Sequence, residues 1–236
     1  MTWPTDYLNK IICGDCLEVM KGIPDNGVDI VITSIPFNAG KNYGETYNDS
    51  LLESEYFRNL DKWIFEMVRV AKVAIYIFTS AKYMNEVRVR LPHFVQYIFW
   101  HRPNIIGTGI RLPWIPTITP IAMSWKSKRL PMINAHTKTT FDFIEAASPQ
   151  SNFNGDMKRC HVAQDPVEPY FRLLARTPNE LILDPFVGSG TSCVAAKLLG
   201  RQFIGIEISE KYCEIARKRI DGTLVNRKLN FIEARL

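Results

Sequence analysis

The strongest constraint on the fold is the stretch Leu181–Glu207, whose sequence is LILDPFVGSGTSCVAAKLLGRQFIGIE. A short apolar run leads into the glycine turn 188–190, and the Ala- and Leu-rich segment 191–199 follows. Gly200 is a typical residue at the end of a helix. A second apolar run, 203–206, then ends at an acid. This order predicts a strand, a glycine turn, a helix and a second strand.

Two features of this unit indicate a ligand. Gly188 and Gly190 let the backbone pass close to a bound molecule, and the N-terminus of the following helix offers free N–H groups. Glu207 comes roughly 20 residues after the glycines, where nucleotide-binding folds hold ribose hydroxyls. The third glycine of the dinucleotide fingerprint and a Gly-Lys-Ser/Thr sequence are both missing, so the turn is not a phosphate-binding loop. On these residues alone, a structural turn with a solvated Glu207 is the alternative.

Length and composition set the class of protein. The chain has 236 residues, 46% of them hydrophobic, which is enough for one substantial core with a small appended module. It has no apolar run of about 18 residues and no signal-peptide pattern at its N-terminus. Five cysteines without framework spacing suit a reducing compartment. We therefore expect a soluble, cytoplasmic protein.

Positive charge is concentrated in one part of the chain. The net charge is +5, yet the segment 87–141 contains no Asp or Glu, and the rest of the chain carries more acids than bases. The basic residues of this segment are Arg88, Arg90, Arg102, Arg111, Lys126, Lys128, Arg129 and Lys138. This concentration favours a surface that faces a polyanion, with a merely solvated basic face as the alternative.

Apolar runs and helical stripes alternate along the chain. Strands are predicted at 10–13, 28–33, 73–78 and 94–100, and helices at 16–22, 56–68, 81–91, 167–176 and 209–220. Ser50 and Glu53 have capping-box spacing before the helical stripe at 56–68. Segment 38–49 is expected to be a mobile loop, and 118–126 an edge strand. The alternation predicts an α/β fold with a doubly wound, mostly parallel sheet.

Four polar residues each follow an apolar strand run. They are Asp15, Ser34, Asp184 and Glu207. Because the carboxyl ends of parallel strands meet at one edge of a sheet, where such folds bind ligands, we expect these side chains to lie close together.

Several motifs resemble one family. DPFVGSGT at 184–191, followed by GRQFIGIEIS at 200–209, resembles the S-adenosylmethionine site of the amino-methylating DNA methyltransferases. Ser34-Ile35-Pro36-Phe37, after VDIVIT, resembles their catalytic tetrapeptide, which is Asp, Asn or Ser followed by Pro-Pro and an aromatic residue. Further matches are GDCLEVM before the tetrapeptide, Asn38 and Lys41-Asn42-Tyr43-Gly44 after it, and His161-x-Ala163-Gln164-x-Pro166 ahead of the cofactor loop. The catalytic element precedes the cofactor loop, which is the order of the β class.

The resemblance implies a Rossmann-like fold with circularly permuted motifs and a small inserted target-recognition segment. On this basis 1–126 is the catalytic half of the methyltransferase domain, 127–157 the recognition insertion and 158–236 the cofactor-binding half of the same domain.

The tetrapeptide suits the chemistry of an exocyclic amine, whose lone pair is delocalised into the base. An oxygen at Ser34 and the carbonyl of Ile35 can accept the two amine hydrogens, which draws the nitrogen toward tetrahedral geometry. The base must leave the duplex to reach the site, and Phe37 offers a face for stacking. We therefore expect the catalytic residues Ser34, Ile35, Pro36 and Phe37; an ordinary turn is the alternative.

Ile35 departs from the family pattern, which has proline at this position. The carbonyl acceptor is retained, and Pro36 still biases Ile35 toward extended geometry. We interpret the change as tolerated, with reduced activity as the alternative.

The resemblance assigns Glu207 to the ribose hydroxyls, and Asp15 with Cys16 to the adenine ring. Asp184 and the following turn are assigned to the methionine part. The expected cofactor-binding residues are Asp15, Cys16, Asp184, Phe186, Gly188, Ser189, Gly190, Thr191 and Glu207. For Asp15, a helix N-cap is the alternative, and one side chain could serve both roles.

Cys13 and Cys16 form a CxxC pair, but no second pair matches it, so no metal site is expected. His93, His101 and His136 lack the context of a catalytic triad, which disfavours a hydrolase.

Together these observations predict a site-specific enzyme that transfers methyl from S-adenosylmethionine to cytosine N4 in double-stranded DNA. In the β class, serine at the first tetrapeptide position tends to accompany cytosine N4; adenine N6 is the alternative. A non-catalytic DNA-binding relative and an RNA or small-molecule methyltransferase are rival hypotheses. The expected DNA contacts are Arg102, Arg111, Lys126, Lys128, Arg129 and Lys138. A homodimer and a cognate restriction endonuclease are open expectations for partners.

Overall fold

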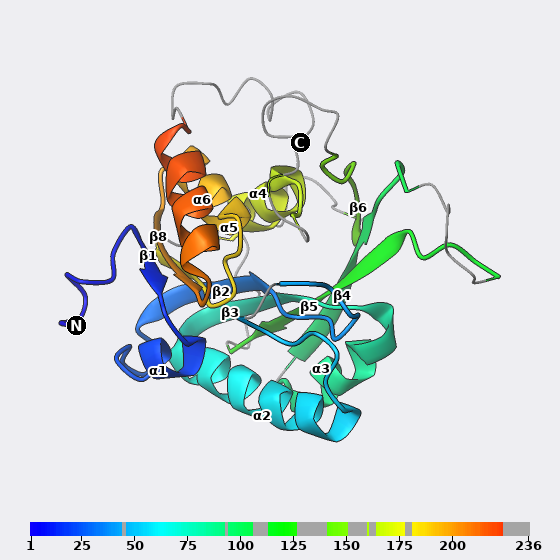
Figure 1. Ribbon diagram of the computed structural model, residues 1–236, viewed down its shortest axis with the longest axis horizontal. Coiled ribbons are helices and arrows are strands. Elements are labelled where there is room, and N and C mark those ends of the chain that lie inside the picture. The colour runs from blue at the N-terminus through cyan, green and yellow to red at the C-terminus, as the bar shows by residue number, and fades with distance from the viewer. Residues whose placement is uncertain are drawn as a thin grey trace.

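The computed structural model describes residues 1–43, 46–92, 94–105, 113–126, 141–150, 160, 164–177 and 181–223. Within them one sheet runs through the molecule, with helices packed on both of its faces (Figure 1). The predicted doubly wound α/β fold is therefore confirmed. No helix in these residues is both long and apolar enough to span a membrane.

The described residues form an eight-stranded, mostly parallel sheet in the order β1-β8-β7-β2-β3-β5-β4-β6. Its strands are β1 (Lys10–Cys13), β2 (Val28–Ser34), β3 (Ala71–Phe78), β4 (Phe94–His101), β5 (Ile118–Trp125), β6 (Phe143–Glu145), β7 (Leu181–Asp184) and β8 (Gln202–Glu207). Strands from β1 across to β3 pair in parallel, whereas β5 pairs antiparallel with β3 and β4. Two strands from the C-terminal part of the chain, β8 and β7, therefore lie between the N-terminal strands β1 and β2.

Three helices cover each face of the sheet within the described residues (Figure 1). On one face lie α1 (Cys16–Met20), α2 (Glu53–Val70) and α3 (Met84–Arg90), and on the other α4 (Val167–Ala175), α5 (Thr191–Leu198) and α6 (Glu210–Asp221). Successive side chains of β3 point to opposite faces of the sheet. Ile75 packs in the core beneath α1, α2 and α3, and Tyr76 packs in the core beneath α4, α5 and α6. Burial on both faces explains why the inner strands are continuous apolar runs.

The end of α5 follows the sequence prediction. Gly200 has φ 68°, its N–H donates to the carbonyl of Lys197 (3.0 Å), and the N–H of Arg201 donates to that of Ala196 (2.9 Å). This pair of hydrogen bonds is a Schellman motif, which requires the left-handed conformation that glycine adopts without strain.

Two predictions about local structure at the start of α2 and in β5 are wrong. Helix α2 begins at Glu53 with Leu52 as its N-cap and no side-chain cap, so the capping box with Ser50 does not form. Strand β5 is interior, because β4 folds back along its outer side. Pro120, which has no N–H to donate, lies just beyond the last paired residues of β3 and β5, Phe78 and Ile121, and its carbonyl accepts the N–H of Thr79 (3.0 Å).

Two further segments are more ordered than expected. In the predicted loop 38–49, the carboxylate of Asp49 accepts the backbone N–H groups of Asn38 (2.9 Å), Ala39 (3.0 Å) and Lys41 (3.0 Å). The predicted insertion 127–157 contributes β6 to the edge of the sheet, parallel to β4. The predicted site residues Arg111, Lys128, Arg129 and Lys138, and the motif residues Gly44, His161 and Ala163, lie outside the described residues.

Candidate active site

A cavity of about 480 Å³ lies along the carboxyl edge of the parallel strands. Asp15, Ser34, Asp184 and Glu207 all line it, although they come from four separate parts of the chain. The sheet order places their strands side by side, so the prediction that these four residues lie close together is confirmed. The volume falls within the roughly 300–1,000 Å³ of small-molecule sites.

The glycine turn between β7 and α5 is fixed by close packing. Gly190 has φ 86° and precedes the first residue of α5. A Cβ built there would lie 3.1 Å from the Cβ of Ala216 in α6, so a larger residue would collide with that helix. From α6, Arg219 donates from Nη1 to the carbonyl oxygen of Ser189 (2.6 Å) and to its hydroxyl (2.9 Å). The turn is therefore held from behind while its other side faces the cavity.

Glu207 ends β8 and holds this turn from the front. Its Oε2 accepts the N–H of Gly188 (3.0 Å), and its Oε1 accepts the N–H of Ser209 (2.9 Å). Burial raises the pKa of the carboxyl above its usual value, and these backbone donors partly offset that effect. Since each carboxylate oxygen carries two lone pairs, both can still accept a ligand hydroxyl from the cavity side.

Asp184 ends β7 and is buried. Its Oδ1 accepts the hydroxyl of Thr33 (2.6 Å) and the N–H of Phe186 (3.0 Å), while its Oδ2 accepts the hydroxyl of Ser192. Burial raises its pKa to about 6, against the effect of these donors. Asp184 thus ties the ends of β2 and β7 to the start of α5.

Asp15 is the N-cap of α1. Its Oδ1 accepts the N–H groups of Leu17 (2.9 Å) and Glu18 (3.1 Å), and the residue also lines the cavity. The structure thus shows the capping role directly and leaves Asp15 placed for the ligand role as well. Cys16, buried behind it, lines the same end of the cavity.

The tetrapeptide runs from the end of β2 into the cavity wall. Ser34 is the last residue of β2, and Ile35 is only 2% exposed, packed in the core beside α2. The hydroxyl of Tyr56 donates to the carbonyl oxygen of Pro36 (2.7 Å), which fixes the turn. Phe37 is half-buried and lines the cavity. The apolar burial of position 35 gives a physical reason for isoleucine where the family pattern has proline.

Sequence reasoning missed two groups on the far side of Ser34. Asp165 and Tyr170 line the cavity, and the Tyr170 hydroxyl donates to Oδ2 of Asp165 (2.8 Å). Asp165 follows no apolar strand run, so the rule that located the other acids could not find it. Its place between Gln164 and Pro166 of a matched motif was the available signal.

Two predicted DNA contacts lie within the described residues. Arg102 lines the cavity, and its Nη2 donates to the carbonyl of Pro116 (2.9 Å). Lys126 instead donates to Oδ1 of Asn26 (2.9 Å), and its N–H bonds the carbonyl of Val73 near the start of β3. Lys126 therefore lies near the amino ends of the parallel strands, whereas the cavity lies along their carboxyl ends.

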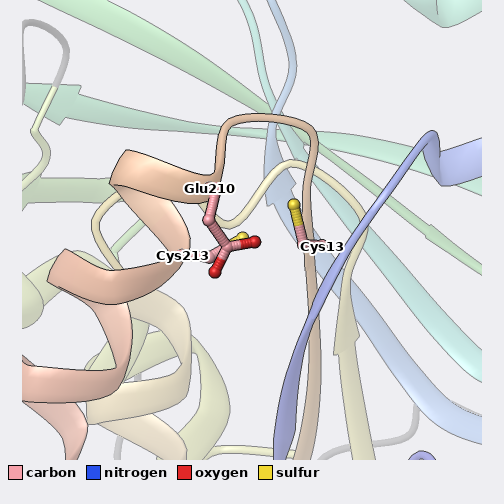
Figure 2. Close-up of side chains that lie close together, drawn as sticks. All are labelled: Cys13, Glu210 and Cys213. Atoms are coloured by element: carbon pink, nitrogen blue, oxygen red, sulfur yellow. The ribbon is translucent and has the colours of Figure 1, made fainter.

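The two cysteines of the CxxC motif have different surroundings. Cys16 is buried, whereas Cys13 is exposed and lies beside Glu210 and Cys213 of α6 (Figure 2). The three ligand atoms lie within 4.8 Å of one another. However, Glu210 also accepts a hydrogen bond from Arg217 (2.7 Å), and its contact with Cys13 raises the pKa of that thiol. Both effects disfavour metal binding, which needs a thiolate.

The fold and the site together define the class of protein. A doubly wound sheet carries a fixed glycine turn and an acid at the end of the next strand, which is how Rossmann-like folds hold a nucleoside. The same cavity continues past Asp184 to a hydroxyl, at Ser34, on the neighbouring strand. This combination defines an α/β protein of Rossmann-like fold with a cavity along the carboxyl edge of its parallel strands.

Comparison with known proteins gives the family. Residues 114–218 match the family model described as DNA methylase. The chain is 30% identical to the type II methyltransferase M.HpaI of Haemophilus parainfluenzae, over 90% of this chain and 74% of that protein. It is 24% identical to the type II methyltransferase M.HinfI of Haemophilus influenzae, over 91% of this chain and 69% of that protein. The chain belongs to the N6/N4 DNA methylase family, the site-specific DNA amino-methyltransferases that use S-adenosylmethionine.

Solved structures share the fold. A crystal structure of the M1.HpyAVI–SAM complex has a TM-score of 0.70 and 23% identity, covering 90% of this chain and 98% of that one. The PvuII DNA methyltransferase, described as cytosine-N4-specific, has a TM-score of 0.73 and 17% identity, covering 94% and 90%.

Proposed function

We propose that this methyltransferase modifies the exocyclic N4 of a cytosine flipped out of double-stranded DNA. The observation that carries the proposal is the position of Ser34, at the end of β2 in the same cavity as Asp184 and Glu207. A neutral hydroxyl can accept a hydrogen from the amine without adding a charge to a half-buried pocket. The fold it shares with a cytosine-N4-specific enzyme is consistent with this choice. Adenine N6 is the second candidate, because the family includes both specificities.

The tetrapeptide Ser34–Phe37 would activate the target amine by placing hydrogen-bond acceptors beside it. The Ser34 hydroxyl and the carbonyl of Ile35 accept its hydrogens, so the nitrogen lone pair is freed from the ring. S-adenosylmethionine, when bound, supplies the electrophilic methyl group. Phe37 presents a face on which the extruded base stacks, and the Tyr56 hydroxyl keeps the backbone of this turn in place.

The cofactor end of the cavity would be built by the residues around Glu207. We assign Glu207 to the ribose hydroxyls, because both of its oxygens are held by backbone donors and keep lone pairs for the ligand. The remaining contacts to the adenine and methionine parts are assigned to Asp15, Cys16, Asp184, Phe186, Gly188, Ser189, Gly190 and Thr191.

DNA would approach the cavity from the β4–β5 side. Arg102 lies at the cavity beside this connection, and the side chain of Trp114 in the same connection is 87% exposed. An exposed aromatic ring in an acid-free basic segment suits contact with bases and phosphates. Arg111, Lys126, Lys128, Arg129 and Lys138 are kept as further proposed phosphate contacts. The division into 1–126, 127–157 and 158–236 is kept as part of the proposal, and β6, from the middle segment, pairs with β4.

Digestion of methylated DNA to nucleosides, followed by mass spectrometry, tests the proposal. N4-methylcytosine is the expected product. A product that contains only N6-methyladenine would select the second candidate and refute the inference from the Ser34 hydroxyl.

A further inference from the structure

Asp165 is placed to act on Ser34 from behind. It precedes α4, and Tyr170 in the first turns of that helix donates its hydroxyl to Oδ2 of Asp165 (2.8 Å). The ring of Tyr170 stacks on Phe78 with centroids 4.4 Å apart and planes 10° from parallel, so this hydroxyl is held in position. The hydroxyl of Thr191 donates to the backbone carbonyl of Asp165 (3.1 Å), which fixes the residue against α5.

The Asp165 carboxyl accepts the Tyr170 hydroxyl and lines the same cavity as Ser34, and the Ser34 hydroxyl acts to lower the pKa of this carboxyl. The other charged or titratable groups that face it are Arg102, after β4, and Tyr43, in the loop that follows the tetrapeptide. Burial raises the pKa of Asp165 to about 6, while the two hydroxyls and the Arg102 charge act to lower it. At neutral pH the group is therefore mostly ionised, yet it is a stronger base than an ordinary aspartate.

We propose that Asp165 is the positioning residue of the proposed methyl transfer, accepting the Ser34 hydroxyl hydrogen and, through Ser34, the proton that the target amine loses. This rests on the proposed role of Ser34. Because the hydroxyl hydrogen points toward Asp165, the Ser34 oxygen turns its lone pairs toward the amine. A serine alone could equally donate its hydrogen toward the base and present the wrong end of its dipole.

The proton balance is simple. As the bond between nitrogen and the methyl carbon forms, the carbon–sulfur bond of the cofactor breaks and its electron pair stays on sulfur. The nitrogen then carries a positive charge and one proton too many. That proton passes to the Ser34 oxygen, and the hydroxyl proton of Ser34 passes to Asp165. The carboxylate becomes a neutral acid, and solvent recovers the proton later.

The interaction between Ser34 and Asp165 can be tested without measuring methyl transfer. In protein labelled with carbon-13 at the Asp carboxyl groups, NMR titration should show two carboxyls with midpoints near 6, from Asp165 and Asp184. Asp165→Asn identifies the first. Ser34→Ala should raise the Asp165 midpoint only, because that carboxylate loses a donor. Thr33→Val is the matched control, since its neighbouring hydroxyl bonds Asp184, and it should raise the Asp184 midpoint only. An Asp165 midpoint that ignores Ser34→Ala overturns the proposal.

The pH dependence of the methyl-transfer rate tests whether Asp165 accepts the proton. Single-turnover methyl transfer should rise with pH to a plateau, with a midpoint near that of Asp165. Asp165→Asn should lose about 100-fold or more of the plateau rate, together with the pH limb, while calorimetric S-adenosylmethionine binding stays unchanged. Tyr170→Phe should move the limb to higher pH, and it provides the test if Asp165→Asn does not fold. An unchanged limb in either folded variant contradicts the proposal. Absence of DNA methylation by the wild type would instead defeat the proposed function itself.

Discussion

Glu207 accepts the backbone N–H of Gly188 at 3.0 Å, so the acid that ends β8 also holds the glycine turn that follows β7. Gly188 lies in the turn after β7, and Glu207 lies 19 residues later, at the end of the adjacent strand β8. The arrangement fixes a carboxylate at the cofactor end of the cavity before any ligand is bound. Preorganisation of this kind limits what a ligand must order when it binds.

Replacing Glu207 should weaken cofactor binding. Glu207→Ala should cost about 1.5–3 kcal/mol of S-adenosylmethionine affinity, the range for hydrogen bonds to a charged group. Calorimetric titration measures the change. Glu210→Ala, an exposed acid one turn further along, is the control and should bind normally. Unchanged affinity in a folded Glu207→Ala variant would remove this residue from the cofactor site.

Gly190 should be far less replaceable than Gly200. Both have positive φ, but a Cβ at Gly190 meets Ala216, whereas a Cβ at Gly200 meets nothing within 4 Å. Gly200→Ala should therefore lower the free energy of unfolding by about 1–2 kcal/mol, from backbone strain alone. Gly190→Ala adds the collision and should cost roughly 2–4 kcal/mol and cofactor affinity as well. Denaturant unfolding compares the two, and equal losses would contradict the packing argument.

Sequence reasoning found the parts of this molecule that depend on local pattern. The βα unit at 181–207 and the strand-end acids follow from periodicity and from the geometry of parallel sheets, and the structure places them as expected. The interior position of β5 could not be foreseen, because Pro120 locally argues for an edge and only the return of β4 decides otherwise. Asp165 was missed for a similar reason: its proposed role depends on Ser34, which lies near it only through tertiary packing. Asp49 shows the same limit, since a polar loop gives no sign that one carboxylate gathers three N–H groups.

The raised pKa of Asp165 should make the protein less stable as pH rises. Its folded value of about 6 lies above the ordinary value, so between those pH values the folded state holds a proton that the unfolded state has lost. Stability from this group is present below pH about 4 and is lost as pH rises through about 6, by up to roughly 3 kcal/mol. The difference in unfolding free energy between Asp165→Asn and the wild type should therefore grow in favour of the variant over that range. A difference that is constant with pH would show that the carboxyl is not buried in this way.

The basic segment should make DNA binding strongly dependent on salt. If Lys128 and Arg129 contact phosphates, reversing both charges should flatten the plot of log affinity against log salt by about two counterions. Lys62→Glu is the control, because Lys62 is an exposed base on α2 outside the basic segment, and it should leave the slope unchanged. Fluorescence anisotropy over a range of salt concentrations measures the slope for the wild type, the double variant and the control. If the Lys62→Glu variant alone flattens the slope, the DNA surface has been placed on the wrong part of the molecule.

The proposed function requires that Ser34 present a cytosine amine to the cofactor held by Glu207. The most direct test is single-turnover transfer of labelled methyl to duplex DNA by the wild type and by Ser34→Ala, with mass spectrometry of the nucleoside products. We expect N4-methylcytosine from the wild type, and from Ser34→Ala a rate lower by about 100-fold or more with cofactor affinity intact. Transfer by Ser34→Ala at the wild-type rate would contradict it.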